Sequence, residues 1–297
     1  MEARASEKQP IGIAGTGRIA QAFGRLLRGS GEPVVAVAGR NPERTQAAAV
    51  FIGAVKATTL SNLPQFATRI LIAVSDEAIT EVAATLAAAG MHGGSALHTC
   101  GALGPEALDP LSRVGVSCGA LHPLQTVATP EQGVIVLRNV SFAVDGEGAA
   151  LRWAEGIVSL LEGRTLHIRP SHRVLYHAAA VMAANYTVAL LDAAVMLMKA
   201  AGVAEQEAME ALAPLAQNSL ANALTLGPAK ALTGPVSRGD KSTIAKHLRA
   251  LADVPGPTRE LYRCAGLQAL AVARSQGLSD TKAKAVEEIL KNIHGNG

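Results

Sequence analysis

The sequence contains few aromatic side chains for its length of 297 residues. Aromatic residues make up 3% of the chain, whereas 49% of it is hydrophobic and much of that fraction is alanine. A chain this apolar has enough material for a folded core, which excludes intrinsic disorder as its ordinary state. The shortage of aromatic side chains and the abundance of alanine predict closely packed helices.

Cysteine is also scarce, and its arrangement excludes two classes of small stapled fold. Cys100, Cys118 and Cys264 are odd in number and isolated, and no C-x-x-C pair occurs. Neither a disulfide framework nor a structural zinc site is therefore indicated. His172 and His177 are five residues apart, which is the wrong spacing for one helix face, so we expect no bound metal.

The sequence lacks any strong excess of charge and any uninterrupted membrane-length apolar segment. Its 27 basic and 24 acidic residues give a formal charge of +3 without a basic run, so we expect no nucleic-acid partner. The polar start of the chain does not resemble a secretory signal. The apolar segment 178–198 is interrupted by Asn185, Thr187 and Asp192, which favours a buried helix over a bilayer span. We therefore expect a cytoplasmic protein without a membrane partner.

Residues 10–22, PIGIAGTGRIAQA, contain the most informative motif of the chain. A short apolar run leads into Gly15-Thr16-Gly17, and a segment with helical spacing follows. Gly15 permits a sharp turn, Gly17 lets a pyrophosphate approach the helix N-terminus, and Ala20 fills the third small position of G-x-G-x-x-G/A. The motif predicts a dinucleotide-binding turn between a strand and a helix.

The residue after the second predicted strand, residues 33–38, indicates which dinucleotide binds. An NAD site usually has Asp or Glu there to bind the ribose 2′-hydroxyl, whereas this chain has Arg40. An arginine binds a 2′-phosphate by charge-assisted hydrogen bonds, and Arg44 can add to it. The alternative is that Arg40 is an ordinary solvated charge. We predict NADP as the cofactor, held by Gly15, Thr16, Gly17, Arg18, Ile19, Arg40, Val74, Ser75 and Thr99.

Strands and helices alternate through the first half of the chain and then give way to helices alone. Further strands are predicted at residues 55–58, 69–74, 96–98, 119–122, 141–144 and 165–168. This alternation predicts an α/β fold with a doubly wound parallel sheet of the Rossmann type. The character changes at residues 169–171, so we predict a cofactor domain over residues 1–169 and an all-α domain for substrate binding and dimerisation over residues 170–297.

Two predicted strands end in histidine. His98 and His122 each follow an apolar run and are followed by hydrogen-bonding residues. Ligands of open α/β sheets bind outside the carboxyl ends of the strands, so both histidines are candidates for pocket lining. A structural role is equally compatible with the pattern. We assign His122 and Gln125 to substrate binding, and we interpret Cys100 as an inert thiol because nothing indicates a low pKa.

The helical half begins with one long predicted helix over residues 172–201. On it His177, Val181 and Asn185 follow at intervals of four, so the two polar side chains share a face. They either form a hydrogen-bonded pair within the core or face the nicotinamide, with His177 as proton donor and Asn185 orienting the substrate. Further helices are predicted at 205–226, from Asp240 or Ser242 to 251, from Pro257 to 276, and after Ser279.

The segment 233–240, TGPVSRGD, forms the second polar cluster of the helical half. Its glycines and proline predict a tight loop that leads into a helix, and Arg238 is suited to binding a carboxylate. We therefore assign Arg238 and Asp240 to substrate binding. The alternative is a helix-initiating turn with a solvated arginine.

The chain resembles Rossmann-like proteins whose helical C-terminal half is the domain of unknown function DUF2520. The glycine turn carries this resemblance, together with HTCGAL at 98–103, HPLQT at 122–126, YHAAAVMAANY at 176–186 and TGPVSRGD at 233–240. The family is similar to pyrroline-carboxylate reductase, ketopantoate reductase and 6-phosphogluconate dehydrogenase-like NADP oxidoreductases. The resemblance implies NADP binding, a homodimer built through the helical domain, and hydride transfer to a C=O or C=N bond.

One position departs from the related hydroxyacid dehydrogenases and ketopantoate reductases. These proteins carry a lysine four residues before the active-site asparagine, where this chain has Val181 if Asn185 is that asparagine. The acid–base role would then pass to His177 or elsewhere. We hypothesise an NADP(H)-dependent reductase of a small carboxylate-bearing 2-oxo or imino compound. The alternative hypothesis is a non-catalytic NADP-binding sensor or interaction protein.

Overall fold

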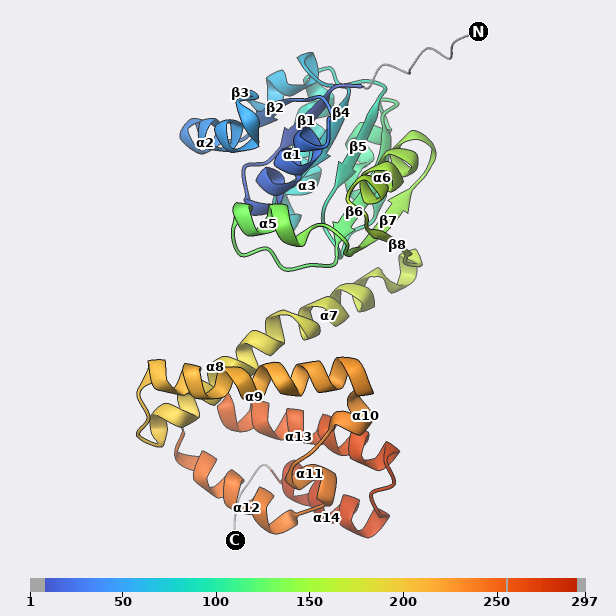
Figure 1. Ribbon diagram of the computed structural model, residues 1–297. Helices are drawn as coiled ribbons and strands as arrows, with labels where there is room; N and C mark the ends of the chain where they lie inside the picture. Colours follow the sequence, from blue (N-terminus) through green and yellow to red (C-terminus); the bar gives the residue numbers. More distant parts are fainter. Residues whose placement is uncertain (1–8, 255, 293–297) are drawn as a thin grey trace. The chain divides into compact units, whose positions relative to one another are not determined.

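The computed structural model describes residues 9–254 and 256–292, which form two compact units (Figure 1). The first unit comprises Met1–Ala183 and the second Ala184–Gly297. The first helix after the sheet, α7 (Arg173–Ala183), therefore belongs to the first unit. Each unit is described separately below.

The first unit contains an eight-stranded sheet with the order β3-β2-β1-β4-β5-β6-β7-β8. The strands are β1 (Ile11–Ala14), β2 (Val34–Ala38), β3 (Lys56–Thr58), β4 (Arg69–Ile72), β5 (Ser95–His98), β6 (Ser117–Pro123), β7 (Ser141–Gly146) and β8 (Arg164–His167). Strands β1 to β6 pair in parallel, β7 pairs antiparallel with β6, and β8 is parallel to β7. The predicted doubly wound α/β fold is confirmed.

Helices cover both faces of this sheet, because successive strand side chains point to opposite faces and both faces are apolar. Leu71 of β4 belongs to the core beneath α1 (Arg18–Gly29), α2 (Pro42–Gly53) and α6 (Gly148–Leu160). Its neighbours Ile70 and Ile72 belong to the opposite core, beneath α3 (Ile79–Ala88) and α4 (Asp109–Ser112). A further short helix, α5 (Pro130–Val136), packs against α1.

The strand order creates a point where the winding reverses. Strand β1 lies between β2 and β4, so the chain first proceeds outward through β2 and β3 and then returns to the other side of β1. Ligands of open α/β sheets bind at this reversal, outside the carboxyl ends of the strands. The loops after β1, β4, β5 and β6 therefore define the edge at which a ligand is expected.

The second unit consists of helices. They are α8 (Asn185–Ala200), α9 (Glu205–Leu226), α10 (Pro228–Ala231), α11 (Pro235–Arg238), α12 (Lys241–Ala250), α13 (Thr258–Ser275) and α14 (Asp280–Lys291). Val236, Ile244, Leu270 and Leu290 are among the residues of a core that α11 to α14 share. Helix α9 matches the prediction residue for residue, and Asp240 begins α12 as predicted.

The long helix predicted over residues 172–201 differs from the structure in two ways. It is divided at Ala184, where φ is −105° and ψ −70°, into α7 and α8. The expectation of burial on nearly all sides is wrong for the single chain, because Val174 is 70% and Val188 69% exposed. By length and composition the segment Pro170–Ala200 is able to cross a membrane, and only 6% of its most apolar window is buried. A single chain therefore leaves most of the apolar surface of this segment unburied.

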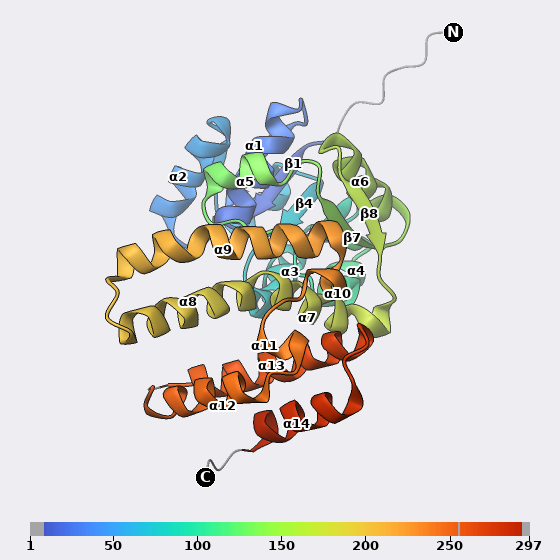
Figure 2. The same ribbon diagram turned by 60° about the horizontal axis from the view of Figure 1, so that its bottom comes forward.

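Helices α8 and α9 run antiparallel, side by side, as both views of the second unit show (Figure 2). Gly202, with φ +91°, lies in the turn between them. Within this pair only Val195 and Ala208 are buried. Leu190, Leu220 and Leu224 are exposed.

Candidate functional site

The turn after β1 adopts a conformation that depends on glycine. Gly15 has φ +127°, which L side chains rarely adopt, and a Cβ at this position would lie 2.2 Å from the carbonyl oxygen of Ala73. The glycine therefore lets the turn pack directly against the end of β4. Val74 lies at the same contact, with Cγ1 3.3 Å from the position of that Cβ.

Gly17 is the N-cap of α1 and leaves the start of this helix open. No atom lies within 4 Å of the place where its Cβ would stand, no side chain caps the helix, and its first turn contains no acidic residue. Arg18 donates a hydrogen bond to the carbonyl oxygen of Ala128, 3.2 Å away, and so ties the loop after β6 to this end of α1. Ile19 packs against the core below. Helix N-termini of this kind attract anions.

The loop after β2 lies beside the glycine turn. A Cβ on Gly39 would come within 2.6 Å of Thr16 Cγ2, so the two loops are in direct contact. Arg40 follows Gly39 and is exposed, as is Arg44 one helical turn later. Asn41 caps α2 by accepting a hydrogen bond from the backbone N–H of Arg44 at 2.9 Å. Arg40 thus stands next to the predicted dinucleotide turn with its side chain in solvent.

The ends of β4 and β5 complete this part of the edge. The backbone N–H of Thr99 donates to the carbonyl oxygen of Ile72 at 3.2 Å, which holds the residue after β5 beside the end of β4. Ser75 is exposed, and Val74 and Thr99 are half-buried. These three residues therefore line the same edge as the glycine turn.

His98 has a structural role at the end of β5. Its Nδ1 accepts a hydrogen bond from the backbone N–H of Cys100, and its Nε2 therefore donates to the carbonyl oxygen of Gly104 at 2.9 Å. The ring is fully buried, and burial lowers its pKa. Both nitrogens of this neutral imidazole are occupied, so the side chain fixes the loop 99–104.

Cys100 is a protonated thiol in this environment. Burial raises its pKa to about 11, and the neighbouring Asp76 carboxylate acts in the same direction. A thiol with this pKa is a poor nucleophile at neutral pH. This agrees with the sequence interpretation of Cys100 as inert.

The strongest polar contact of the site joins His122 on β6 to Tyr176 on α7. His122 Nδ1 and the Tyr176 hydroxyl oxygen are 2.8 Å apart, and the rings meet edge to face with centroids 5.6 Å apart. Burial lowers the pKa of His122 to about 4, with further contributions from His177 and Arg173. Burial also raises the pKa of Tyr176 to about 12. At neutral pH the pair therefore consists of a neutral imidazole and a protonated phenol.

His177 lies beside this pair and against the loop after β5. The His122 and His177 rings are 6.0 Å apart, and His177 Nδ1 is buried without a hydrogen-bond partner among the described residues. A Cβ on Gly101 would lie 2.8 Å from His122 Nε2 and 2.8 Å from His177 Nδ1. Gly101 thus allows the backbone to touch both imidazoles, and the loop after β5 and helix α7 share one polar cluster.

An ion pair that sequence reasoning missed attaches α7 to the sheet. Arg173 in the first turn of α7 donates to Asp145 of β7 at 2.7 Å, and the arginine is only 3% exposed. Nε and Nη1 of this guanidinium have no hydrogen-bond partner within residues 9–254 and 256–292. Tyr176 was also missed as a site residue. Both pairs connect positions far apart in the chain, and only the contact of α7 with the sheet brings them together.

Three of the predicted residues belong to the second unit. Asn185 is exposed at the start of α8, and Arg238 is exposed at the end of α11. Asp240 caps α12, because its carboxylate accepts hydrogen bonds from Thr243 N at 3.0 Å and Thr243 Oγ1 at 2.7 Å. These hydrogen bonds lower the pKa of Asp240. The carboxylate thus already serves as the cap that the sequence predicted for this helix.

Within the first unit the structure therefore brings together the loops that contain Gly15, Gly17, Arg40, Val74, Ser75 and Thr99, and it places His122 with His177. Gln125 is exposed beyond β6, with its side-chain oxygen accepting from Thr126 N at 2.8 Å. Across residues 9–254 and 256–292 no three His, Cys, Asp or Glu side chains gather as ligands for a metal ion.

Comparison with known protein families gives two matches, one in each half of the chain. Residues 3–123 match the family model of a Rossmann-like domain, and residues 140–269 match the model described as Domain of unknown function (DUF2520). No curated protein matches the chain.

Solved structures with the same fold include a protein of Bacteroides fragilis described as a candidate NADP oxidoreductase. It is 23% identical, with a TM-score of 0.73 over 90% of this chain and 98% of that one. A reductive aminase of Aspergillus terreus in complex with NADPH and ethyl-5-oxohexanoate is 20% identical, with a TM-score of 0.56 over 96% and 93%.

A 1-pyrroline-5-carboxylate reductase of Streptococcus pyogenes is 18% identical to the chain. Its TM-score is 0.56, over 95% of this chain and 97% of that one. At these identities the similarity establishes the fold. The family models thus identify residues 3–123 as Rossmann-like and residues 140–269 as similar to the domain of unknown function DUF2520.

Proposed function

We propose that the protein is an NADP(H)-dependent oxidoreductase that reduces a C=O or C=N bond of a small carboxylate-bearing compound, either a 2-oxo acid or a cyclic imine. The observation that carries the proposal is the position of the His122–Tyr176–His177 cluster at the same sheet edge as the glycine turn. The names of the similar structures support it, since they include a reductase of a pyrroline carboxylate and a reductive aminase with NADPH.

The residues around the glycine turn fit a dinucleotide. The open N-terminus of α1, with the bare backbone of Gly17, suits a pyrophosphate. Exposed Arg40, in the loop that touches Thr16, suits a ribose 2′-phosphate. Gly15, Arg18, Ile19, Val74, Ser75 and Thr99 complete the proposed set of cofactor residues.

When bound, NADPH supplies a hydride to the substrate carbon. The substrate oxygen or nitrogen then requires one proton, and we assign its delivery to the histidine cluster. His177 is the proposed proton donor. We propose positioning roles for His122 and Tyr176. His122 is neutral at neutral pH and cannot supply the proton as an imidazolium. The Tyr176 hydroxyl holds the His122 ring in place.

We also propose Arg238 and Asn185 as substrate-binding residues. Exposed Arg238 is suited to pair with a carboxylate, and Asn185 can both donate and accept hydrogen bonds. His122 and Gln125 are likewise proposed to bind the substrate. We reassign Asp240 to the structure of α12, because both of its carboxylate oxygens bond Thr243.

Turnover tests the assignment of His177. NADPH oxidation is followed at its absorbance band across a panel of 2-oxo acids, with and without ammonia, and cyclic imines. His177→Ala should lower turnover roughly 10²–10⁴-fold, the usual contribution of a general acid, while NADPH binding is retained. Tyr176→Phe, which keeps the ring and removes the hydroxyl, should cost less. If His177→Ala keeps full turnover and Tyr176→Phe loses it, the proton comes from Tyr176.

The same panel separates the enzyme from the rival candidate, a non-catalytic NADP-binding sensor. Val181 favours the sensor, because related reductases have a lysine at the position that we align with it. Tight NADPH binding without oxidation by any compound of the panel would support the sensor and contradict the reductase.

Cofactor choice tests the role of Arg40. Arg40→Asp should weaken NADP(H) binding about tenfold or more through loss of a charge-assisted contact, and it should affect NAD(H) far less. Arg113→Asp is the matched control, because this exposed arginine precedes β6 at the opposite edge of the sheet. Equal losses for both cofactors in Arg40→Asp would remove the phosphate assignment.

We also propose that the protein is a homodimer joined through α8 and α9. Val188, Leu190, Leu220 and Leu224 are between 47% and 79% exposed, and the two helices bury little of their own apolar surface. A contiguous apolar surface of this kind marks an interface. Exposed Asp192 on α8 favours a protein partner over lipid, and a second copy of the same pair of helices would cover both surfaces at once.

A further inference from the structure

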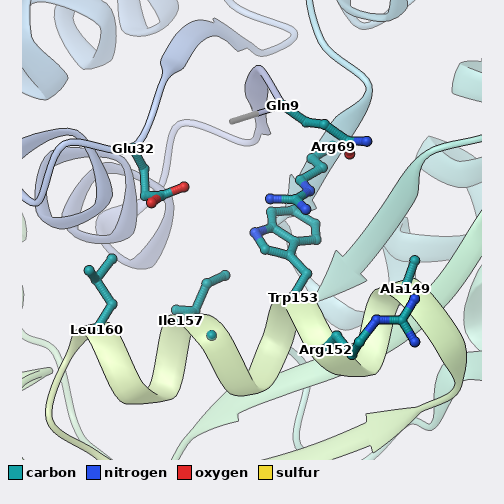
Figure 3. A pocket seen from close by; sticks show the side chains of 9 residues that line it. Gln9, Glu32, Arg69, Ala149, Arg152, Trp153, Ile157 and Leu160 are labelled. Carbon is teal, nitrogen blue, oxygen red and sulfur yellow. The ribbon is translucent and has the colours of Figure 1, made fainter. Parts of the chain in front are cut away.

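A cavity lies in the first unit, near the amino ends of the parallel strands and thus at the end of the sheet opposite to the glycine turn. Its volume is about 380 Å³, within the range of small-molecule sites. Glu32 lies two residues before β2, and Arg69 begins β4, so both residues are close to the amino ends of parallel strands. One face of α6, with Trp153, Ile157 and Leu160, forms the remaining wall (Figure 3).

Two hydrogen-bond donors at this cavity have no partner among the residues that the structure describes. Trp153 is 5% exposed, and its indole Nε1–H has no acceptor. The Nε–H of Arg69 is also buried without an acceptor, and the guanidinium stands 5.7 Å from the centroid of the indole ring. Buried polar groups in folded proteins are almost always hydrogen-bonded, so two adjacent exceptions on one wall require an explanation. A bound group with acceptor oxygens would satisfy both.

The other walls restrict the chemistry of such a group. Figure 3 shows the Glu32 carboxylate pointing across the cavity toward the side on which the Trp153 nitrogen and the Arg69 guanidinium lie. A carboxylate has several acceptor positions and can bind a cation in addition to other contacts. Ile157 and Leu160 supply an apolar surface between these two walls.

We propose that this cavity binds a small aliphatic α-amino acid. Its carboxylate accepts hydrogen bonds from Arg69 and Trp153, its ammonium group meets Glu32, and its side chain lies on Ile157 and Leu160. A zwitterion matches a site whose donors and acceptor stand on opposite walls. A phosphate ester would bring at least one further negative charge close to Glu32, and of the two arginines that line the cavity only Arg69 lies beside the indole, whereas Arg152 points away from it.

The sole tryptophan of the chain provides the measurement. Because Trp153 is the only indole, its emission reports on this cavity alone when the full-length protein is excited at a wavelength that tyrosine does not absorb. L-leucine is titrated in the absence of cofactor, and a saturable change in emission is expected. The analogue 4-methylpentanoate lacks the ammonium group and isoamylamine lacks the carboxylate, so both should bind more weakly than leucine.

Variants then assign the binding to the named residues. Arg69→Met keeps the length of the side chain and removes the guanidinium. It should weaken leucine binding about tenfold or more, as measured by calorimetry. Trp153→Phe keeps a ring and removes the N–H, and it should also weaken binding. Arg152→Met is the matched control, because Arg152 also lines the cavity but points away from the indole and from Glu32 in Figure 3.

Two results would overturn the proposal. One is the absence of any saturable fluorescence or calorimetric response of the wild-type protein to leucine. The other is a lack of specificity, seen either as equal binding of leucine and 4-methylpentanoate or as equal losses of affinity in Arg69→Met and Arg152→Met. Either observation would contradict the predicted contacts. Retained NADPH binding in each variant shows that the fold is intact, and neither test depends on turnover.

Discussion

At the scale of single residues, surroundings decide what the histidines of this protein can do. His98 uses both ring nitrogens within its own loop, and His122 is held by Tyr176. Identical side chains at the ends of neighbouring strands thus have different roles, one structural and one at the candidate site. Two predictions concern this residue scale.

The first prediction concerns pH and stability. Burial lowers the pKa of His122 to about 4, whereas an unfolded histidine has a pKa of about 6.5. Between these values the unfolded chain binds a proton that the folded chain does not. The stability that the folded protein gains from keeping His122 neutral is therefore fully present above about pH 6.5 and is lost as the pH falls toward about 4. His122→Asn, which keeps a polar atom near the Nδ1 position, should remove on the order of 2 kcal/mol of this pH dependence.

Urea unfolding of both proteins across this pH range measures the effect. The wild-type protein should lose stability more steeply than His122→Asn as the pH is lowered. An identical slope for the two proteins would show that the proton is taken up elsewhere.

The second prediction concerns Gly101. Its Cβ would lie 2.8 Å from atoms of both His122 and His177, so Gly101→Ala must displace the histidines or the loop. We expect a loss of about 1–3 kcal/mol of stability and a fall in turnover with NADPH binding retained. Gly156→Ala is the control: it lies in α6 with no atom within 4 Å of its Cβ and should gain up to about 1 kcal/mol.

Chemical denaturation and NADPH oxidation measure the two effects. Wild-type stability and turnover in Gly101→Ala would mean that the contact between the loop after β5 and the two histidines has no consequence.

At the scale of elements, α7 is attached to the sheet by the Arg173–Asp145 ion pair and by the hydrogen bond between Tyr176 and His122. Its outward side chains, among them Val174 and Leu175, are exposed, and Arg173 is the one residue of this helix that is buried. The pair of Arg173 with Asp145 therefore fixes the first turn of α7, and the same turn leads directly to Tyr176 and His177.

This attachment yields the third prediction. Arg173→Met should cost about 3–5 kcal/mol, because it leaves the Asp145 carboxylate partly buried without its cation. The amides of the first turn of α7 should also exchange faster with deuterated solvent. Lys199→Met is the control, since the Lys199–Glu205 pair is exposed and its loss should leave the free energy of unfolding nearly unchanged. Equal effects of the two substitutions would contradict the anchoring role.

At the scale of the whole molecule, the apolar surface of α8 and α9 exceeds what one chain can bury. The unit that contains these helices places its own core among α11 to α14. The proposed dimer would cover the remaining apolar surface of α8 and α9, and the fourth prediction concerns its formation.

Light scattering should give twice the mass of one 30.4 kDa chain. Leu220→Glu should shift the protein to the monomer, because it places a charge in the apolar interface. Thr225→Glu, an equally exposed position on another side of α9, should leave the dimer intact. Thermal stability should rise with protein concentration in the wild type only. A monomeric wild-type protein would exclude the proposed interface.

The predictability of the fold and of the site differs from one feature to the next. The alternation of strands and helices, the turn at Gly15 and the bounds of α9 were predicted because short-range patterns specify them. Cys100 was interpreted as inert because nothing in its motif indicates a low pKa, and burial raises that pKa to about 11. The burial of the long apolar helix was predicted wrongly, because apolar composition specifies a partner surface but not the chain that supplies it.

The sequence by itself determined the α/β order, the glycine turn and the cap at Asp240, since each depends on residues a few positions apart. Only the tertiary structure decided which distant side chains meet. His122 and Tyr176 are 54 residues apart, and Arg173 and Asp145 are 28 apart. Their contacts depend on strand order and on the path of α7, which no local pattern encodes. The cavity beside Trp153 also depends on the tertiary structure, because its walls come from residues near the starts of two strands and from a helix that follows much later in the chain.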